Sequence, residues 1–172
     1  FLTLEEVQAL VKADCESEQL KTAFLFACLT GLRWSDINKL LWSEVQHSDE
    51  MGYYIRFRQQ KTKGAETLPI SEQARNMLGE EQEQTERVFK GLKYSAWHNV
   101  KLLQWVMRAG ITKNITFHCA RHTYATLQLT MGTDIYTVSK LLGHRELKTT
   151  QIYAKVIDSK KKEAANKIQL DL

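Results

Sequence analysis

The sequence predicts an α+β fold that is mainly helical and contains one small antiparallel sheet. The helical part follows from apolar residues that recur every three or four positions along most of the 172-residue chain. The sheet follows from the segment YYIRFR at residues 53–58, in which Ile55 and Phe57 alternate with Arg56 and Arg58. Short segments on either side supply two further strands, so we expect three strands in total.

The first half of the chain carries start and stop signals for helices. Thr3 is the expected N-cap of the opening helix, and Glu6 completes a capping box three residues later. The apolar run AFLFACL at residues 23–29 predicts a buried helix that ends at Gly31. The next helix is expected to start near Ser35.

The two strands that flank YYIRFR are expected over residues 45–47 and 67–70. The connection QQKTKGAE between the second and third strands is polar and contains a glycine, which predicts a mobile hairpin tip. Because Pro69 cannot donate a backbone hydrogen bond, the third strand is expected at an edge of the sheet.

The rest of the chain predicts three more helices, each followed by a glycine that ends it: Gly110, Gly132 and Gly143. Thr133 or Asp134 is the expected N-cap of the last of these helices. No internal repeat interrupts this order, so the helices are expected to pack around the small sheet.

Length and composition favour a single domain over residues 1–172, with a tail from about residue 157. Since the chain begins inside a helix pattern and not at a methionine, we expect a fragment of a longer protein. The longest strongly apolar run, at residues 23–29, is far shorter than the ~20 residues that span a bilayer. Three cysteines without CxxC spacing argue against a disulfide framework or a cysteine zinc site. These features predict a soluble domain in a reducing cytoplasm.

The formal net charge of +4 is a weak indication of a nucleic-acid partner. The distribution of charge says more, because Arg56, Arg58, Lys61 and Lys63 fall within eight residues and lysines occupy all of positions 160–162. Solvated charged faces would explain both clusters equally well. Charge alone therefore leaves both interpretations open.

The segment HCARHTYAT places His118 and Arg121 three residues apart, so on a helix both side chains can contact the same small anion. His118 and His122 also have the spacing of a zinc-binding helix, but the glutamate of HExxH is absent and Arg121 lies between them. A third interpretation is structural: His118 caps the helix and Arg121 forms a surface ion pair. Taken alone, the motif favours the structural interpretation.

Two other segments change that balance. TGLRWSDINKL carries Arg33 just after a glycine turn, and LLGHRELKTTQIYAKV carries His144 with Tyr153 nine residues later. Together with His118 and Arg121, in this order, these residues resemble the signature of the tyrosine recombinases of the phage integrase family. The resemblance covers most of the chain and is strongest to integrases of bacterial mobile elements. It implies a recombinase catalytic domain, which the family precedes with a core-binding domain that residues 1–172 do not include.

The resemblance implies that Tyr153 is a nucleophile, which cleaves one DNA strand to a 3′-phosphotyrosyl intermediate and a free 5′ hydroxyl. It also implies that Arg33 and Arg121 grip the scissile phosphate, and guanidinium suits this task because it donates paired hydrogen bonds and stays protonated. His118 and His144 complete the anion-binding set, and one of them, with His118 favoured, helps to remove the tyrosine proton. The family uses no metal, cofactor or ATP, so none is expected.

In the family, a lysine on the hairpin between the second and third strands protonates the leaving oxygen. Lys61 fits that position, and Lys63 is close enough to remain an alternative. Asp36 matches an acidic position that supports the first arginine. Arg56, Arg58 and Lys63 are expected to contact DNA.

The implied function is site-specific recombination, in the integration or excision of a mobile element such as a transposon. The implied partners are double-stranded DNA at specific sites and further copies of the chain, four of which hold two sites. The expected location is the bacterial cytoplasm, at the nucleoid. Two alternatives remain: a type IB topoisomerase, which the LLGH wording disfavours, and an inactive DNA-binding module, which the filled catalytic positions disfavour.

The residues after Tyr153 predict one further feature. Ala164, Ile168 and Leu172 recur at four-residue spacing, which predicts an apolar stripe along a short helix. Such a stripe must be covered by other residues. It either folds back onto its own domain or docks on a neighbouring copy, as tails of the family do, and both possibilities stay open.

Overall fold

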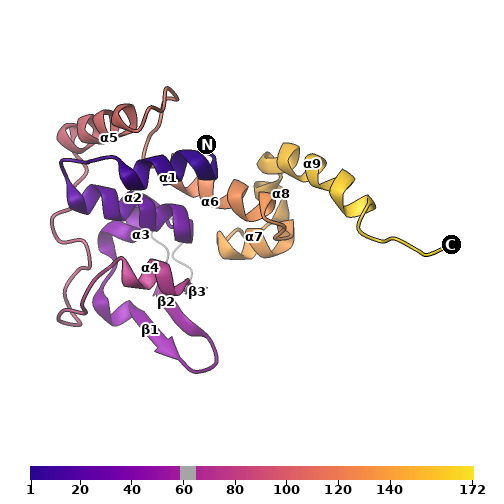
Figure 1. The fold of residues 1–172 in the computed structure, drawn as a ribbon. Coiled ribbons are helices and arrows are strands. Elements are labelled where there is room, and N and C mark those ends of the chain that lie inside the picture. The colour runs from indigo at the N-terminus through magenta and orange to yellow at the C-terminus, as the bar shows by residue number, and fades with distance from the viewer. Residues whose placement is uncertain (59–64) are drawn as a thin grey trace. The chain divides into compact units, whose positions relative to one another are not determined.

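The computed structural model describes residues 1–58 and 65–172, and Figure 1 shows their fold. These residues form two compact units, Phe1–Tyr124 and Ala125–Leu172, and the boundary falls inside a helix. Each unit is mainly helical, and the sheet belongs to the first. The predicted α+β class is therefore confirmed, while the expectation of a single domain stays a prediction.

The helices of the first unit are α1 (Leu4–Lys12), α2 (Glu18–Thr30), α3 (Trp34–Lys39), the short 3-10 helix η1 (Trp42–Glu44), α4 (Glu72–Asn76), α5 (Ala96–Arg108) and the start of α6 (Cys119–Thr130). The predicted capping box is confirmed. Thr3 Oγ1 accepts a hydrogen bond from the Glu6 N–H at 3.1 Å, and Glu6 Oε1 accepts one from the Thr3 N–H at 2.9 Å. Among the helices described, none is long and apolar enough to cross a membrane.

The core of the first unit is built around α2, whose residues are apolar on nearly every side. Phe24 on α2 and Trp105 on α5 are both fully buried, and their rings meet edge to face at 5.6 Å. The indole N–H of Trp105 donates a hydrogen bond to the carbonyl oxygen of Leu10 at 3.0 Å. The same tryptophan therefore joins α5 to both α2 and α1.

The sheet consists of β1 (Val45–Ser48), β2 (Gly52–Arg58) and β3 (Ala65–Pro69), which pair antiparallel in the order β1-β2-β3. Ile55 and Phe57 on the central strand are buried, whereas Arg56 and Arg58 are exposed, so the predicted alternation is confirmed. Pro69 ends the third strand, which lies at an edge of the sheet as predicted.

The predicted hairpin tip falls almost entirely on residues 59–64, which lie outside the described residues. Lys61 and Lys63 belong to this segment. The strand β3 already begins at Ala65, so the last two residues of the QQKTKGAE segment belong to the sheet.

The second unit continues from α6 into α7 (Ile135–Leu141), α8 (Leu147–Thr150), the 3-10 helix η2 (Gln151–Tyr153) and α9 (Ala154–Ala165). Asp134 is the N-cap of α7, because its Oδ1 accepts a hydrogen bond from the Thr137 N–H at 2.8 Å. Gly143 follows the helix with φ 72°, a left-handed conformation in which glycine ends helices, as predicted.

The apolar stripe predicted after Tyr153 is not present. The helix α9 ends at Ala165, so Ile168 and Leu172 do not lie on it. Asn166 explains the stop: its side-chain Nδ2 donates to the carbonyl oxygen of Lys162 at 2.9 Å and satisfies one of the open acceptors at the helix end. Ile168 and Leu172 are exposed, and neither packs back on the second unit.

Candidate functional site

The loop that carries Arg33 is set by the end of α2. Gly31 adopts φ 75°, a left-handed conformation that glycine reaches without strain, and its N–H donates to the carbonyl oxygen of Ala27 at 2.8 Å. Thr30 is buried next to it, and its hydroxyl donates to the carbonyl oxygen of Phe26 at 2.8 Å. Two residues after the glycine, Arg33 is the N-cap residue of α3.

Arg33 carries an unusual donor. Its Nη1 atom is buried, and within residues 1–58 and 65–172 it has no hydrogen-bond partner. The only other described side-chain nitrogen in that condition is Trp42 Nε1. A buried donor on a charged group is costly when it stays unpaired. This nitrogen is therefore suited to receive an anion.

Arg121 joins α6 to the same loop. The residue is 6% exposed, and its Nη1 donates a hydrogen bond to the carbonyl oxygen of Gly31 at 2.7 Å. This contact spans 90 positions of the sequence, and it ties the HCARHTYAT segment to the TGLRWSDINKL segment. Two of the predicted site segments therefore meet in the first unit.

His118 is the residue just before α6, within one position of the predicted helix start. It is exposed, and its ring meets that of His122 edge to face, with centroids 4.6 Å apart. Burial, followed by the nearby charges of His118 and Arg121, lowers the pKa of His122. Of the two rings, that of His118, three residues before Arg121, is the more exposed.

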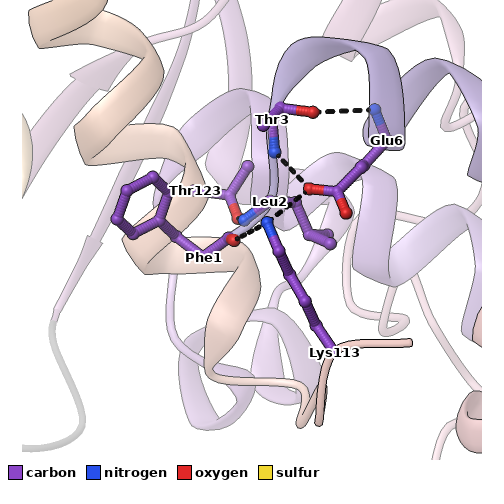
Figure 2. Close-up of polar contacts among 6 residues, drawn as sticks. All are labelled: Phe1, Leu2, Thr3, Glu6, Lys113 and Thr123. Atoms are coloured by element: carbon purple, nitrogen blue, oxygen red, sulfur yellow. Dashed lines mark hydrogen bonds and ion pairs between the residues drawn. The ribbon is translucent and has the colours of Figure 1, made fainter. Parts of the chain in front are cut away.

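The first residues of the chain also contact α6 and the segment before it (Figure 2). The Leu2 N–H donates to Thr123 Oγ1 at 3.0 Å, and both residues are fully buried. Lys113 Nζ donates to the carbonyl oxygen of Phe1 at 3.1 Å and to Glu6 Oε1 at 2.7 Å. We call this set of five residues the N-terminal clasp.

The contacts of the clasp also change the pKa of the Glu6 carboxyl group. Burial by itself would raise the pKa of its carboxyl group, but hydrogen bonds from Lys113 and Thr3 and the positive charge of Lys113 outweigh that effect. The pKa of Glu6 is therefore held below its usual value.

The remaining predicted residues of the first unit that the structure describes are Asp36 on α3 and the two arginines of β2. Asp36 is 3% exposed in the first turn of α3, and its N–H donates to the carbonyl oxygen of Arg33 at 3.1 Å. Arg56 and Arg58 are exposed on β2, and Lys39 Nζ donates to the carbonyl oxygen of Arg58.

The second unit carries His144 and Tyr153. His144 follows Gly143, its N–H donates to the carbonyl oxygen of Ser139 at 3.0 Å, and its Nδ1 shares a hydrogen bond of 2.7 Å with Thr150 Oγ1. Thr150 is fully buried, so this contact fixes the orientation of the imidazole ring. Thr150 stands in the same sequence motif as His144, but sequence reasoning assigned it no role.

Tyr153 ends the short helix η2 and is the N-cap residue of α9. It is 8% exposed, although both of its immediate neighbours in sequence are exposed. One turn separates it from Thr150, so the residue that orients His144 and the tyrosine belong to the same pair of short helices.

The amino-acid sequence that contains these segments is similar to sequences of known proteins. The sequence profile described as the phage integrase family matches residues 1–160. A tyrosine recombinase of Thermosipho africanus is 30% identical over 178 residues, which cover 98% of this chain and 61% of the relative. The chain thus spans about three fifths of the length of this relative.

Solved structures extend the likeness to the fold. The catalytic domain of bacteriophage HP1 integrase matches with a TM-score of 0.70 and 26% identity over 98% of each chain. XerH recombinase bound to a palindromic difH substrate matches with a TM-score of 0.68 and 16% identity over 95% of this chain and 50% of that one. With its motifs in order and its profile matched over residues 1–160, this chain belongs to the phage integrase family.

Proposed function

We propose that this chain is the catalytic part of a tyrosine site-specific recombinase, which cuts one DNA strand at a time and rejoins it to a new partner. One observation supports this most strongly. The hydrogen bond from Arg121 to the Gly31 carbonyl brings the second arginine to the loop of the first, where the buried Nη1 of Arg33 has no partner among the described residues. Two guanidinium groups that lie near each other can bind the anionic oxygens of one phosphodiester through paired hydrogen bonds.

The proposed reaction starts with Tyr153. Its phenolic oxygen attacks the scissile phosphorus, a phosphotyrosyl bond forms at the 3′ side, and the bond from phosphorus to the 5′ oxygen breaks. Negative charge grows on the non-bridging oxygens in the transition state, and hydrogen bonds from Arg33 and Arg121 stabilise it. The covalent bond retains the energy of the phosphodiester, so the reverse attack by a 5′ hydroxyl rejoins a strand without ATP.

The histidines have supporting roles in this proposal. His118 and His144 donate hydrogen bonds to the phosphate, and the exposure of His118 suits it to take the proton of the tyrosine. Thr150 holds His144 in orientation through their 2.7 Å hydrogen bond. Asp36, buried three residues after Arg33, supports that arginine.

The leaving 5′ oxygen needs a proton as its bond to phosphorus breaks. We assign this proton to Lys61, with Lys63 as the alternative. Arg56, Arg58 and Lys63 would contact the DNA backbone around the cleaved phosphate. Both exposed arginines lie on β2, which directly precedes residues 59–64 in the sequence.

We further propose that the substrate is double-stranded DNA at a specific site, in the integration or excision of a mobile element. Two sites would be held by four copies, in the cytoplasm of a bacterium. The XerH relative is bound to its own substrate, difH, which supports DNA as the partner here. No metal ion or other cofactor takes part in the proposed reaction.

A selection for covalent adducts tests the proposal and identifies the target sequence in the same experiment. The 172-residue chain is incubated with nicked duplexes of randomised sequence, and protein-linked DNA is recovered under denaturing conditions and sequenced. We expect the recovered DNA to be enriched in one sequence, and adducts to form equally well in excess chelator. Tyr153→Phe should bind the enriched DNA normally and form no adduct. Adduct formation by Tyr153→Phe, or none by the unaltered chain, contradicts the proposal.

A further inference from the structure

A cavity of about 470 Å³ lies beside His118 in the first unit. It is lined by residues of α2, α3 and α5 and of the segments before α5 and α6, and the lining includes Trp34, Tyr94, Asn99 and Phe117 as well as His118. Its volume falls in the range of small-ligand sites. The proposed phosphate chemistry uses His118 but none of the other lining residues.

Aromatic rings form one wall of this cavity. Phe117 meets Trp34 edge to face at 5.0 Å and is held from behind by Phe24 at 5.6 Å. Tyr94 meets Trp34 at 6.2 Å and is 80% exposed. A flat ring that stacks on the exposed ring of Tyr94 would bury apolar surface of both rings. This wall is therefore suited to a planar aromatic ligand.

The rest of the lining combines polar and basic side chains with four apolar ones, Leu20, Leu102, Leu103 and Ile115. Lys93 and His118 are both exposed at the cavity, and Asn99 and Asn114 add amide groups that can donate and accept hydrogen bonds. Two residues relate the cavity to the proposed anion site. Trp34 directly follows Arg33 in sequence, and His118 belongs to both sites. A ligand here would combine a flat ring with a nearby phosphate.

We propose that this cavity holds an unpaired base of the cleaved DNA strand during strand exchange. The proposal rests on the recombinase function and specifies one of its steps. After cleavage, the bases next to the free 5′ hydroxyl must leave their complement before they pair with another strand. An unpaired base loses its stacking partners, and stacking on protein aromatic rings replaces them. A base that stays in the duplex cannot reach such a wall.

Photocrosslinking tests the location of the base. The probe is a duplex with the enriched target sequence, a 5′-bridging phosphorothiolate at the cleaved phosphate and 5-iodouracil as the first base of the released strand. The thiol that leaves does not rejoin, so the covalent intermediate accumulates with the released strand still present. We expect crosslinks to Trp34, Tyr94 or Phe117 in this intermediate, and none of them in the uncleaved complex of Tyr153→Phe. Normal adduct yield with crosslinks elsewhere or none overturns the proposal and leaves the recombinase function intact.

Variants of the most exposed wall residue test the consequence. Tyr94→Ala should lower the ratio of strand transfer to cleavage by about tenfold, a loss at the lower end of the range for base stacking. Tyr94→Phe keeps the ring and should restore the ratio. Tyr136→Ala is the matched control, since Tyr136 is 61% exposed and does not line the cavity. A ratio in Tyr94→Ala equal to that of the unaltered chain, or a loss shared by Tyr94→Phe, contradicts the stacking role.

Discussion

Arg33 and Arg121, the two arginines of the proposed anion site, differ in the hydrogen bonds that they already make. Arg121 is anchored, since one nitrogen of its guanidinium already donates to the Gly31 carbonyl. Arg33 presents a buried nitrogen with no partner in the described part of the chain. A phosphate that binds here would therefore complete the bonding of Arg33, while the position of Arg121 is set before binding.

The role proposed for Lys61 leads to a prediction that separates it from the arginines. Lys61→Ala should lose most of its cleavage activity on ordinary DNA, because the 5′ oxygen then leaves without a proton. A 5′-bridging phosphorothiolate has a leaving group that needs little protonation, so it should restore cleavage by Lys61→Ala. Arg121→Ala should not be restored, since charge on the non-bridging oxygens is unchanged. Rates of adduct formation on both substrates provide the measurement.

The same experiment decides between the two lysines of residues 59–64. Lys63→Ala should keep its activity on ordinary DNA within a few-fold if this residue contacts only the backbone. Rescue of Lys63→Ala and not of Lys61→Ala would reverse the assignment.

At the residue level, the motifs identify candidate site residues but do not predict the contacts of their side chains. Arg33, His118, Arg121, His144 and Tyr153 stand in motifs, whereas the bond from Arg121 to Gly31 joins residues 90 positions apart. The role of Thr150 was missed for a similar reason. Only the fold shows that its hydroxyl is buried against the ring of His144.

At the level of elements, capping residues and glycines in the sequence predicted several helix ends. They did not predict every helix or how far each one extends. Thr3, Gly31 and Gly143 mark the ends at which the structure places them, because caps depend on a few neighbouring atoms. The helix α4, capped by Ser71, was not predicted within its acidic surroundings. Four-residue spacing after Tyr153 predicted a stripe, but the side-chain cap at Asn166 ends the helix first.

The N-terminal clasp predicts a loss of stability when its buried bond is removed. Thr123→Val keeps the shape of the side chain and leaves the Leu2 N–H buried without its acceptor, which should lower the free energy of unfolding by about 1–3 kcal/mol. Thr112→Val is the control, because Thr112 is exposed. Urea unfolding of the three proteins gives the values. Equal stability of Thr123→Val and Thr112→Val would show that the buried bond contributes little.

The clasp also predicts a dependence of stability on pH. Because the folded pKa of Glu6 is lowered, its carboxylate contributes stability that is fully present above its usual pKa of 4.5 and is lost as the pH falls through the lowered value. Glu6→Gln should therefore be less stable than the unaltered chain at pH 6. The difference should shrink once the pH falls below about 4.5. Urea unfolding of both proteins from pH 6 to pH 3 measures it, and a constant difference would exclude Glu6 as the cause.

At the scale of the whole molecule, the last residues of the chain leave apolar side chains exposed to solvent. Ile168, Leu170 and Leu172 are all strongly exposed, and they alternate with polar residues. By contrast, Lys160 and Ala164 of α9 line a cleft of about 290 Å³ together with residues near the start of α7. Removal of the last five residues therefore tests the tail without disturbing α9.

We predict that a chain without residues 168–172 keeps its thermal midpoint and its binding to a single DNA site, since no buried surface is lost. If the tail docks on a neighbouring copy, assembly on paired sites and recombination should fall. Replacement of Ile168, Leu170 and Leu172 by serine should have the same effect, and replacement of Gln169 and Asp171 by alanine should not. Calorimetry, gel shifts and a paired-site recombination assay measure these outcomes. A large drop in the thermal midpoint would mean that the tail packs on its own chain.

Gly31 has a consequence for how members of this family are surveyed by sequence. Its N–H ends α2, its carbonyl oxygen holds Arg121, and its φ of 75° disfavours every other residue. A natural variant with a bulky side chain here would keep all five motif residues and still strain the turn whose carbonyl oxygen accepts from Arg121. A census that counts only those five residues would score that variant as intact, so the glycine belongs among the positions by which working and decayed copies are told apart.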